Sequence, residues 1–468
     1  MTKQLIIIGG GPGGYTAAIR GAQLGAKVTL IEKDLVGGTC LNRGCIPTKT
    51  LYRTAEIMSH FKHASTFAIN NASESTVDPV ALKQRCDQVS TQLREGIEQL
   101  IRANAIEYVQ GSARLLCPTS VLVTLSDQSE VTLESDAIVI ATGSVPTIIP
   151  IPGADLEGVI TSDDLLKMDY LPKSMAIVGG GVIGVEFATI YNAFGTEIQI
   201  AEYFPNLLNA LDSDIAKRFT TSLKRRGITS HTSVAVERIE KNADGLLTVH
   251  MTGKNGAISL QAEKVLLATG RKPYTEGLAL DELGIIHTPK GIAVNNAYQT
   301  NVPSIYAIGD VLGGVMLAHW AAHQGITAVE HALGENPHLE VPSIPGCIFT
   351  FPEIATVGLT EDAAKEAFGG NHQTSKFMFG ANGKALSLGE GEGFVKVVAD
   401  DKGIIVGLHI MGPHASDLIH EGVIAIEKRM TAEDFKPMVH AHPTLSESVY
   451  EAIMGLNNEA IHMAPSKK

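Results

Sequence analysis

The stretch Leu5-Ile6-Ile7-Ile8-Gly9-Gly10-Gly11-Pro12-Gly13-Gly14 joins a run of apolar residues to a glycine-rich turn. An apolar strand, the pattern G-x-G-x-x-G and a helix start together form the fingerprint of a dinucleotide-binding α/β unit. Glycine permits the tight turn, lets the backbone approach a pyrophosphate, and allows close packing of helix on strand. The pattern assigns these roles to Gly9, Gly11 and Gly14.

The same device occurs a second time, in Met175-Ala176-Ile177-Val178-Gly179-Gly180-Gly181-Val182-Ile183-Gly184. Eighteen positions separate Gly14 from Glu32, and eighteen separate Gly184 from Glu202. An acidic residue at the end of the second strand binds a ribose diol. The matched spacing predicts two dinucleotide sites, the second of which uses Gly179, Gly181, Gly184 and Glu202. Each copy closes with Ala-Thr-Gly after an apolar strand, at 141–143 and at 268–270, which adds Thr142, Gly143 and Gly270.

Two cysteines lie five residues apart within Gly37-Gly38-Thr39-Cys40-Leu41-Asn42-Arg43-Gly44-Cys45-Ile46-Pro47-Thr48-Lys49. On an ideal helix their Cα atoms would be about 7.5 Å apart along the axis, so a disulfide needs a distorted turn, which Gly44 permits. A strained bond that closes so short a loop is readily reduced. The pattern indicates a redox-active pair; two buried thiols or half of a metal site are the alternatives, and no second pair exists to complete a metal site.

The cysteine pair belongs to an insertion. Gly9 and Gly143 are 134 positions apart, whereas Gly179 and Gly270 are 91 apart. The extra length also contains an amphipathic segment that we expect to form a helix starting at Asp78-Pro79. Four-residue spacing predicts burial of Val89, Leu93, Ile97 and Ile101.

Composition excludes several classes of protein. The chain has 37 basic and 50 acidic residues and a formal charge of −13, which argues against nucleic acid or anionic membrane as the main partner. No apolar run approaches the ~20 residues of a membrane span. An apolar strand begins at Leu5, so we expect no signal or transit peptide and a cytoplasmic location.

The C-terminal region carries a histidine motif, His440-Ala441-His442-Pro443-Thr444-Leu445-Ser446-Glu447. Histidine is the natural base for a thiol, and Glu447 can orient the ring of His442. An alternative interpretation is that His440 and His442 together bind a metal ion. Alternating residues such as 394–398 predict an antiparallel sheet from about 343 onward, with helices near 415–429 and 446–455.

Taken in order, these motifs show that the whole chain resembles the flavin disulfide oxidoreductases. The resemblance rests on the Cys40–Lys49 motif, both glycine fingerprints, both Ala-Thr-Gly turns, the segment from Tyr306 to Asp310, and the histidine motif. It implies an α/β fold of two Rossmann-like domains and a C-terminal α+β dimerisation domain. The implied boundaries are 1–146 for the FAD-binding part, 147–272 for the NAD-binding part, 273–342 for completion of the FAD-binding region and 343–468 for the dimer interface.

The resemblance also implies a reaction and its residues. A homodimer would oxidise dihydrolipoyl groups carried by the core proteins and lipoyl domains of 2-oxoacid dehydrogenase complexes or of the glycine cleavage system, and would reduce NAD. Cys40, Cys45, His442 and Glu447 would be catalytic, and Lys49 and Glu186 would pair near the cofactors. The implied FAD contacts are Gly9, Gly11, Gly14, Glu32, Lys49, Gly111, Thr142, Gly143, Asp310, Met316, Leu317 and Ala318, and the implied NAD contacts are Gly179, Gly181, Gly184, Glu186, Glu202 and Gly270.

NAD is preferred to NADP on a physical ground, because Glu202 would repel a 2′-phosphate and no Lys or Arg follows before Lys217. That absence argues against glutathione reductase, and the lack of a C-terminal cysteine pair argues against mercuric reductase. A non-catalytic flavin-binding protein is the remaining alternative. The chain departs from the family at Trp320, where lysine is common, and at Ala322, His323 and Gln324, where acidic residues are usual.

Overall fold

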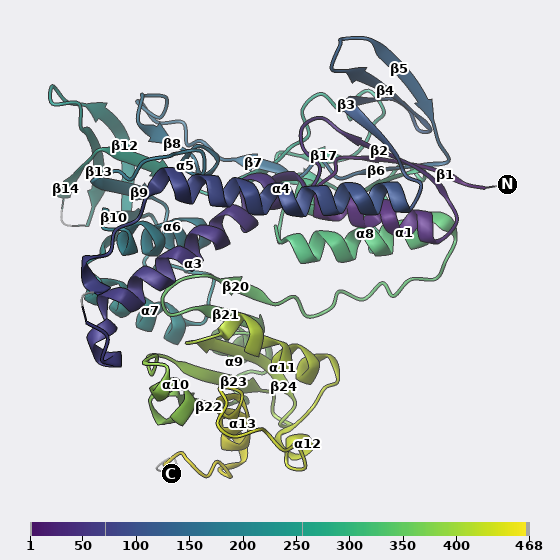
Figure 1. Cartoon of the computed structure of the whole chain (residues 1–468). Coiled ribbons are helices and arrows are strands. Elements are labelled where there is room, and N and C mark those ends of the chain that lie inside the picture. Colours follow the sequence, from purple (N-terminus) through teal and green to yellow (C-terminus); the bar gives the residue numbers. More distant parts are fainter. Residues whose placement is uncertain (1, 71, 255, 465–468) are drawn as a thin grey trace.

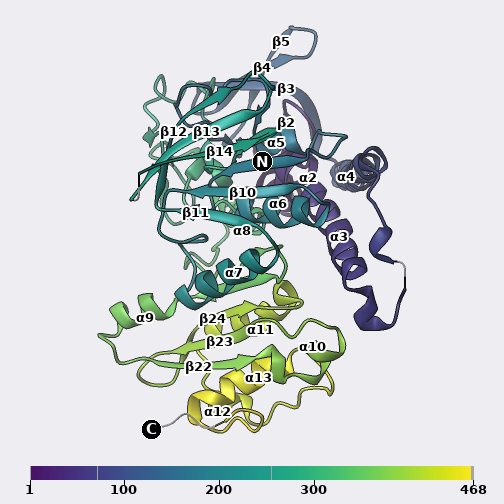
Figure 2. The same cartoon turned by 90° about the vertical axis from the view of Figure 1, so that its left-hand side faces the viewer.

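The computed structural model describes residues 2–70, 72–254 and 256–464, which form three main sheets, three smaller sheets and covering helices (Figures 1 and 2). In Figure 1 the first sheet lies at the upper right, the second at the upper left and the third below both. Within the described residues no helix is long and apolar enough to cross a bilayer.

The first sheet has seven strands in the order β19-β6-β1-β2-β3-β4-β5. Its parallel part orders β1 between β6 and β2, and β3, β4 and β5 continue it as an antiparallel meander. The bounds are β1 Gln4–Ile8, β2 Lys27–Glu32, β3 Glu107–Cys117, β4 Ser120–Leu125, β5 Glu130–Glu134, β6 Ala137–Ile140 and β19 Ile305–Ala307. Continuous apolar runs form these parallel strands because both of their faces are buried.

Helices α1 (Pro12–Gln23) and α8 (Ala318–Leu333) lie side by side on one face of this sheet (Figure 1). Short strands β7 (Ser144–Pro146) and β16 (Arg271–Pro273) pair antiparallel, so the two crossings to the second sheet are adjacent. A two-stranded ribbon of β17 (His287–Thr288) and β18 (Gly291–Ile292) follows.

The second sheet repeats the plan with five parallel strands in the order β11-β10-β9-β15-β8 and an antiparallel layer of β12, β13 and β14. The bounds are β8 Val159–Ile160, α5 Ser162–Leu165, β9 Ser174–Val178, α6 Val182–Ala193, β10 Glu197–Glu202, α7 Ser213–Arg225, β11 Thr229–Thr232, β12 Val234–Lys241, β13 Leu247–Gly253, β14 Gly256–Ala262 and β15 Lys264–Leu267. The predicted repeat is therefore confirmed, with β2 and β10 ending at the expected acids.

The insertion forms three helices, α2 (Gly38–Arg43), α3 (Cys45–Lys62) and α4 (Pro79–Ala103). Asp78 caps α4 by accepting a hydrogen bond from the Ala81 N–H, as its position predicts. The predicted burial of Leu93 is wrong, since 43% of it is exposed, and Val89 and Ile97 are only half-buried. The helix spans two separate apolar cores, one holding Leu82 and Cys86 and the other Ile101, and Leu93 lies between them.

The third sheet is antiparallel, in the order β20-β21-β24-β23-β22, as predicted for the C-terminal region. The bounds are β20 Gly346–Ile348, β21 Ile354–Gly358, α9 Glu361–Ala367, β22 Gln373–Met378, α10 Gly383–Ser387, β23 Phe394–Ala399, β24 Ile405–Met411, α11 Ala415–Glu427, α12 Ala432–Phe435 and α13 Glu447–Met454. Helices α11 and α13 pack on it around a core that includes Val397 and Ile410.

Candidate active site and dinucleotide sites

The cysteine pair lies at the junction of α2 and α3. Gly44 breaks the helix between them with φ −150° and ψ −112°, and an added Cβ would lie 2.9 Å from the Thr39 carbonyl oxygen. This is the distorted turn that the five-residue spacing requires. Both cysteines are free thiols in the structure, which corresponds to the reduced form of a dithiol/disulfide pair.

The two thiols differ in acidity. The hydrogen bond that the Cys45 sulfur receives from Cys40 lowers the pKa of Cys45 to about 7, against the opposing effect of burial, and the charge of Lys49 lowers it further. The same hydrogen bond, together with burial, raises the pKa of Cys40. Cys45 is therefore the more acidic thiol of the reduced pair, and Cys40 is the one that keeps its proton more tightly.

Lys49 and Glu186 complete this cluster. The Lys49 Nζ lies 3.1 Å from both carboxylate oxygens of Glu186, which is 5% exposed. Glu186 also accepts the Phe349 backbone N–H at 2.9 Å, and the Lys49 ammonium lies 4.4 Å from the Phe349 ring centroid. The structure thus brings the predicted ion pair beside the cysteines. The sequence motifs did not identify Phe349 as part of this cluster, because no pattern in the neighbouring residues indicates its contact with α6.

Both glycine turns have the close packing that their motif demands. A Cβ at Gly14 would lie 1.8 Å from the Gly9 carbonyl oxygen, and one at Gly184 would lie 2.0 Å from that of Gly179. No residue other than glycine fits these positions without displacement of the strand. The first turns of α1 and α6 offer backbone N–H groups that have no intrahelical partner, as an anion-binding helix start requires.

The middle glycines face open space. Nothing lies within 4 Å of a Cβ built on Gly181, and the only neighbour of one on Gly11 is the Gly38 Cα at 4.0 Å. Open space in front of helix N-termini is what a pyrophosphate needs. The residues present therefore fit two bound dinucleotides.

The two acids make matched contacts. Glu32 accepts the Gly10 N–H at 2.7 Å, and Glu202 accepts the Gly180 N–H at 2.5 Å. The second oxygen of each carboxylate accepts a backbone N–H from two residues farther on. Since an ionised carboxylate offers about four acceptor sites, each acid keeps capacity for a ribose diol.

Polar contacts hold the segment that carries Asp310, a residue expected at the first site. Ser144 donates to Asp310 Oδ2 at 2.6 Å, and Arg271 donates to the Ser144 hydroxyl at 2.7 Å. The Gly309 N–H, next to Asp310, donates to the Gln324 side chain at 2.7 Å. Asp310 is therefore fixed by a chain of polar contacts that motif reading did not identify.

The N-termini of α1 and α8 meet at the same place, because a Cβ on Gly13 would lie 3.0 Å from the Ala321 carbonyl oxygen. Met316, Leu317 and Ala318 lead into α8 at this contact. Gly111 follows the β3 residue that pairs with Glu32. The Thr142 hydroxyl donates to the Tyr274 carbonyl oxygen at 2.6 Å, and the turns at Gly143 and Gly270 have positive φ, which favours glycine.

The departures from the family pattern are packed into the fold. Trp320 is 8% exposed and stacks on His323 with ring centroids 5.5 Å apart, so it packs within the fold. Gln324 is 5% exposed and supplies the acceptor for Gly309. A neutral amide does there what a carboxylate could also do.

The histidine motif lies in the C-terminal part. His442 Nδ1 is 2.9 Å from Glu447 Oε1, and Glu447 Oε2 accepts the Thr444 N–H at 2.8 Å. Burial opposes ionisation of Glu447, but these two contacts outweigh it and lower its pKa. His440 instead contacts Glu421 at 3.1 Å. Among the described residues no group of three or more His, Cys, Asp or Glu could hold a metal.

Within one chain the histidine does not meet the cysteines. Figure 2 shows α2 in the upper part of the molecule and α13, which begins at Glu447, in the lower part. The His442 side chain is 79% exposed. The dyad and the dithiol thus lie in different parts of the chain.

Comparison with known proteins agrees with this geometry. Residues 3–325 match the family described as pyridine nucleotide-disulphide oxidoreductase, and residues 344–453 match its dimerisation domain. A dihydrolipoyl dehydrogenase of Bacillus subtilis is 41% identical over 98% of this chain and 99% of its own length. The mitochondrial dihydrolipoyl dehydrogenase 2 of Arabidopsis thaliana is 38% identical over 98% of this chain and 92% of its own length.

A solved structure, the HOCl-induced flavoprotein disulfide reductase RclA from Escherichia coli, superposes with a TM-score of 0.86 at 28% identity, covering 96% of this chain and 99% of that one. The dimerisation-domain match supports a homodimer. The chain belongs to the pyridine nucleotide-disulphide oxidoreductase family, which confirms the expected α/β oxidoreductase with a redox-active cysteine pair that uses FAD and NAD.

Proposed function

We propose that the protein is a dihydrolipoyl dehydrogenase, which oxidises protein-bound dihydrolipoamide to lipoamide and reduces NAD. The observation that carries the proposal is the pairing of an acidic thiol, Cys45, with the proton-holding Cys40 beside the Lys49–Glu186 ion pair. Full-length relatives of that name support the choice of substrate.

The chemistry of the chain's own residues follows from their positions. His442, oriented by Glu447, takes a proton from one substrate thiol. The thiolate attacks the Cys40 sulfur of the disulfide, and Cys45 leaves as a thiolate. The second substrate thiol then attacks the substrate sulfur of the mixed disulfide and closes the lipoamide ring; Cys40 leaves and takes up the proton that this thiol loses. Bound FAD would carry the two electrons from the dithiol to NAD.

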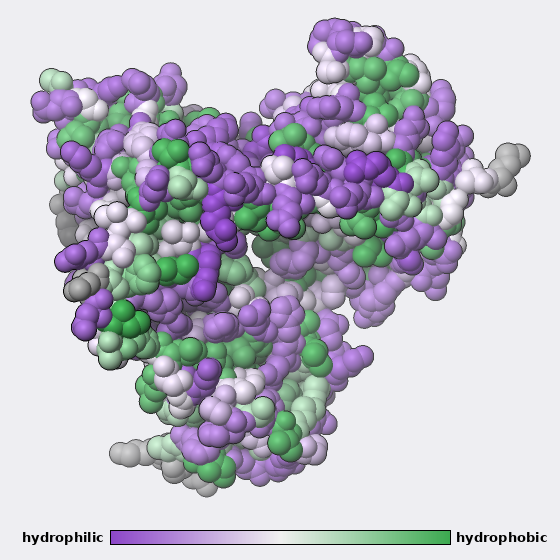
Figure 3. Space-filling model, in the orientation of Figure 1, coloured by the Kyte–Doolittle hydropathy of each residue, from purple (hydrophilic) through white to green (hydrophobic). Residues whose placement is uncertain are grey.

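The division of the chain is part of the proposal. Residues 1–146 and 273–342 would bind FAD, residues 147–272 NAD, and residues 343–468 the partner subunit. Exposed apolar side chains on the C-terminal part support the last assignment: Val439 is 97% exposed, and Ile424 is 59% exposed. Figure 3 shows green, hydrophobic residues reaching the surface of this lower part.

The lipoyl domains and core proteins of 2-oxoacid dehydrogenase complexes, or of the glycine cleavage system, would be its partners. A cytoplasmic location stays a proposal, since the relatives include bacterial and mitochondrial proteins.

Steady-state turnover tests the function. The purified protein should reduce NAD with dihydrolipoamide at least ~100-fold faster than with glutathione, and Cys45→Ser should abolish the reaction. Equal rates with both thiols would contradict the substrate assignment. Comparable rates in wild type and Cys45→Ser would contradict the redox role of the pair.

A further inference from the structure

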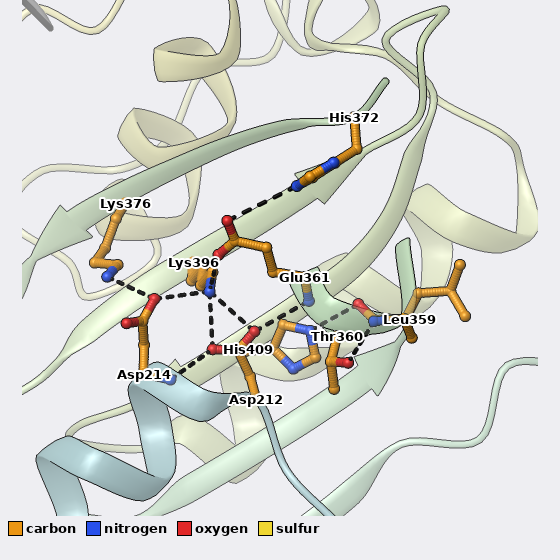
Figure 4. Close-up of polar contacts among 10 residues, drawn as sticks. Asp212, Asp214, Leu359, Thr360, Glu361, His372, Lys376, Lys396 and His409 are labelled. Atoms are coloured by element: carbon orange, nitrogen blue, oxygen red, sulfur yellow. Dashed lines mark hydrogen bonds and ion pairs between the residues drawn. The ribbon is translucent and has the colours of Figure 1, made fainter. Parts of the chain in front are cut away.

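Lys396 of β23 is a buried lysine outside the proposed reaction (Figure 4). It is 1% exposed, and its Nζ lies 2.9 Å from both carboxylate oxygens of Asp212 and 2.7 Å from Oδ2 of Asp214. Glu361 Oε2 is 2.5 Å away. One ammonium from the C-terminal sheet thus binds three carboxylates, two of which belong to the part that carries the second glycine turn.

The cluster is held by charge. Burial opposes ionisation of Lys396, but the three carboxylates outweigh it and raise its pKa. Burial also opposes ionisation of Asp214, yet hydrogen bonds from Lys376 and Lys396 lower its pKa to about 2. The other titratable groups facing the cluster are His372, 3.7 Å from Glu361, and His409 of β24, whose pKa burial lowers. Removing this buried cation would leave Asp212 and Glu361 without their ammonium partner, and Asp214 would keep only Lys376.

The aspartates place α7 on the C-terminal part. Asp212 is the N-cap of α7 and accepts the Asp214 N–H at 3.0 Å. Near the other end of this helix, the Ser222 hydroxyl donates to Glu392 at 3.1 Å. The helix is therefore docked at both ends.

The chain segment between Glu202 and Asp212 links this anchor to the second glycine turn. The Leu208 N–H donates to the Gly180 carbonyl oxygen at 3.0 Å, and a Cβ on Gly180 would lie 2.4 Å from a methyl group of Leu207. The Phe204 N–H donates to Glu202 at 2.7 Å. Residues 203–211, which we call the acid loop, thus support both the turn and the acid.

The first glycine turn receives the same kind of backbone hydrogen bond from the loop after its acid, but that loop, within the residues that the structure describes, has no contact with the Lys396 cluster. There the Gly37 N–H donates to the Gly10 carbonyl oxygen at 2.8 Å, and the chain continues into α2. Residues 33–37 are consequently an internal control for any effect on the acid loop.

We propose that Lys396 is a positioning residue for the second dinucleotide site: by holding Asp212 and Asp214 it fixes the acid loop, and with it the carboxylate of Glu202, for the adenosine ribose of NAD. This rests on the proposed use of that site for NAD. The ion cluster itself lies outside the glycine turn and acts through the loop.

Lys396→Met tests the proposal, because methionine keeps the length of the side chain and removes its charge. Amide hydrogen exchange in residues 203–211 should accelerate at least ~10-fold, while exchange in residues 33–37 stays unchanged. The Kd for NADH should rise at least ~5-fold, with the FAD content and the rate of flavin reduction by dihydrolipoamide unchanged. Equal acceleration in both loops, or none in 203–211, would overturn the proposal.

Matched variants separate positioning from loss of stability. Lys376→Met should have a smaller effect, since Lys376 contacts Asp214 and not Asp212. Asp212→Asn breaks the same contact from the other side and decides the question if Lys396→Met fails to fold. Lowering the pH from about 8 to about 5.5 should slow acid-loop exchange in Lys396→Met relative to residues 33–37, because protonation neutralises the uncompensated carboxylates.

A pH-independent defect in Lys396→Met would point to a packing cavity and contradict the ionic role. If wild-type protein binds no NADH, the proposed function fails. The exchange comparison then still decides whether Lys396 holds the acid loop, since it needs no bound cofactor.

Discussion

The Lys49 ammonium lies 3.1 Å from both carboxylate oxygens of Glu186, and the two residues come from α3 and α6, 137 positions apart in the chain. The pair affects the reactive thiol in opposite senses. Lys49 lowers the pKa of Cys45, and Glu186 raises it. The charge on the thiol therefore depends on a contact between two parts of the fold.

Opposite substitutions at this pair should move the Cys45 titration in opposite directions. Lys49→Met should raise the Cys45 pKa from about 7 by about one pH unit, and Glu186→Gln should lower it by a similar amount. Ultraviolet thiolate absorbance of the reduced protein, followed against pH, measures both. A shift of the same sign in both variants would contradict the electrostatic account.

Spectroscopy should distinguish the roles of the Cys40 and Cys45 sulfurs. If Cys45 is the thiolate beside the flavin, Cys40→Ser should keep a long-wavelength charge-transfer absorbance and should lose lipoamide turnover. Cys45→Ser should lose both signals. The reverse pattern would exchange their roles, and full activity in either variant would return the pair to an ordinary packing role.

Gly181→Ala should weaken NADH binding without weakening the fold. The residue has φ −77°, which alanine adopts, and no atom lies within 4 Å of the added Cβ. The methyl group would occupy the space through which the backbone approaches the pyrophosphate, so the Kd for NADH should rise at least ~10-fold while the free energy of unfolding changes by under ~0.5 kcal/mol.

Gly184→Ala is the contrasting control for that variant, since its Cβ would lie 2.0 Å from the Gly179 carbonyl oxygen. It should destabilise the fold as well as impair binding. Unchanged NADH affinity in Gly181→Ala would show that the dinucleotide does not pass the second glycine.

Exchanging charge at the second acid should change the nicotinamide preference. Glu202→Ala combined with Tyr203→Arg removes a repelling carboxylate and adds an attracting cation, and Tyr203 is 71% exposed, so arginine is accommodated. The ratio of kcat/KM for NAD to that for NADP should fall at least ~10-fold. Equal kcat/KM for the two cofactors in the wild type would refute the argument from Glu202.

The dithiol and the histidine should meet across the dimer. His442→Gln should slow the dihydrolipoamide reaction by roughly 10² to 10⁴, the usual contribution of a general base, and should slow flavin reduction by NADH less. Mixing Cys45→Ser chains with His442→Gln chains should restore about a quarter of wild-type activity, because random pairing makes about half of the dimers mixed and each mixed dimer has one complete site of two.

A site formed within one chain predicts no recovery in that mixture. Subunit exchange is confirmed independently by mass spectrometry of differently labelled chains. A mixture that has exchanged subunits and remains as inactive as its parents would exclude the shared site.

The amino-acid sequence alone predicted the repeated strand, glycine turn and acid, the helix start at Asp78 and the antiparallel C-terminal sheet. Each of these was predicted from patterns within short stretches of the chain. A Cβ added at Gly14 would clash with the carbonyl oxygen of Gly9, five residues away. The Asp78 side chain caps its own helix by accepting the Ala81 N–H. Because local backbone geometry restricts such patterns, few other structures are open to them.

Which distant residues share a site depends on the tertiary structure. It placed Phe349 on Glu186, exposed Leu93 between two cores, and buried Lys396 against Asp212, 184 positions away. The periodicity of apolar residues in the sequence does not predict these contacts. A lysine or a leucine has the same neighbours in the chain whether it faces solvent or another domain. Their environment is set by how the three sheets pack together, and the burial and compensating charges arise only there.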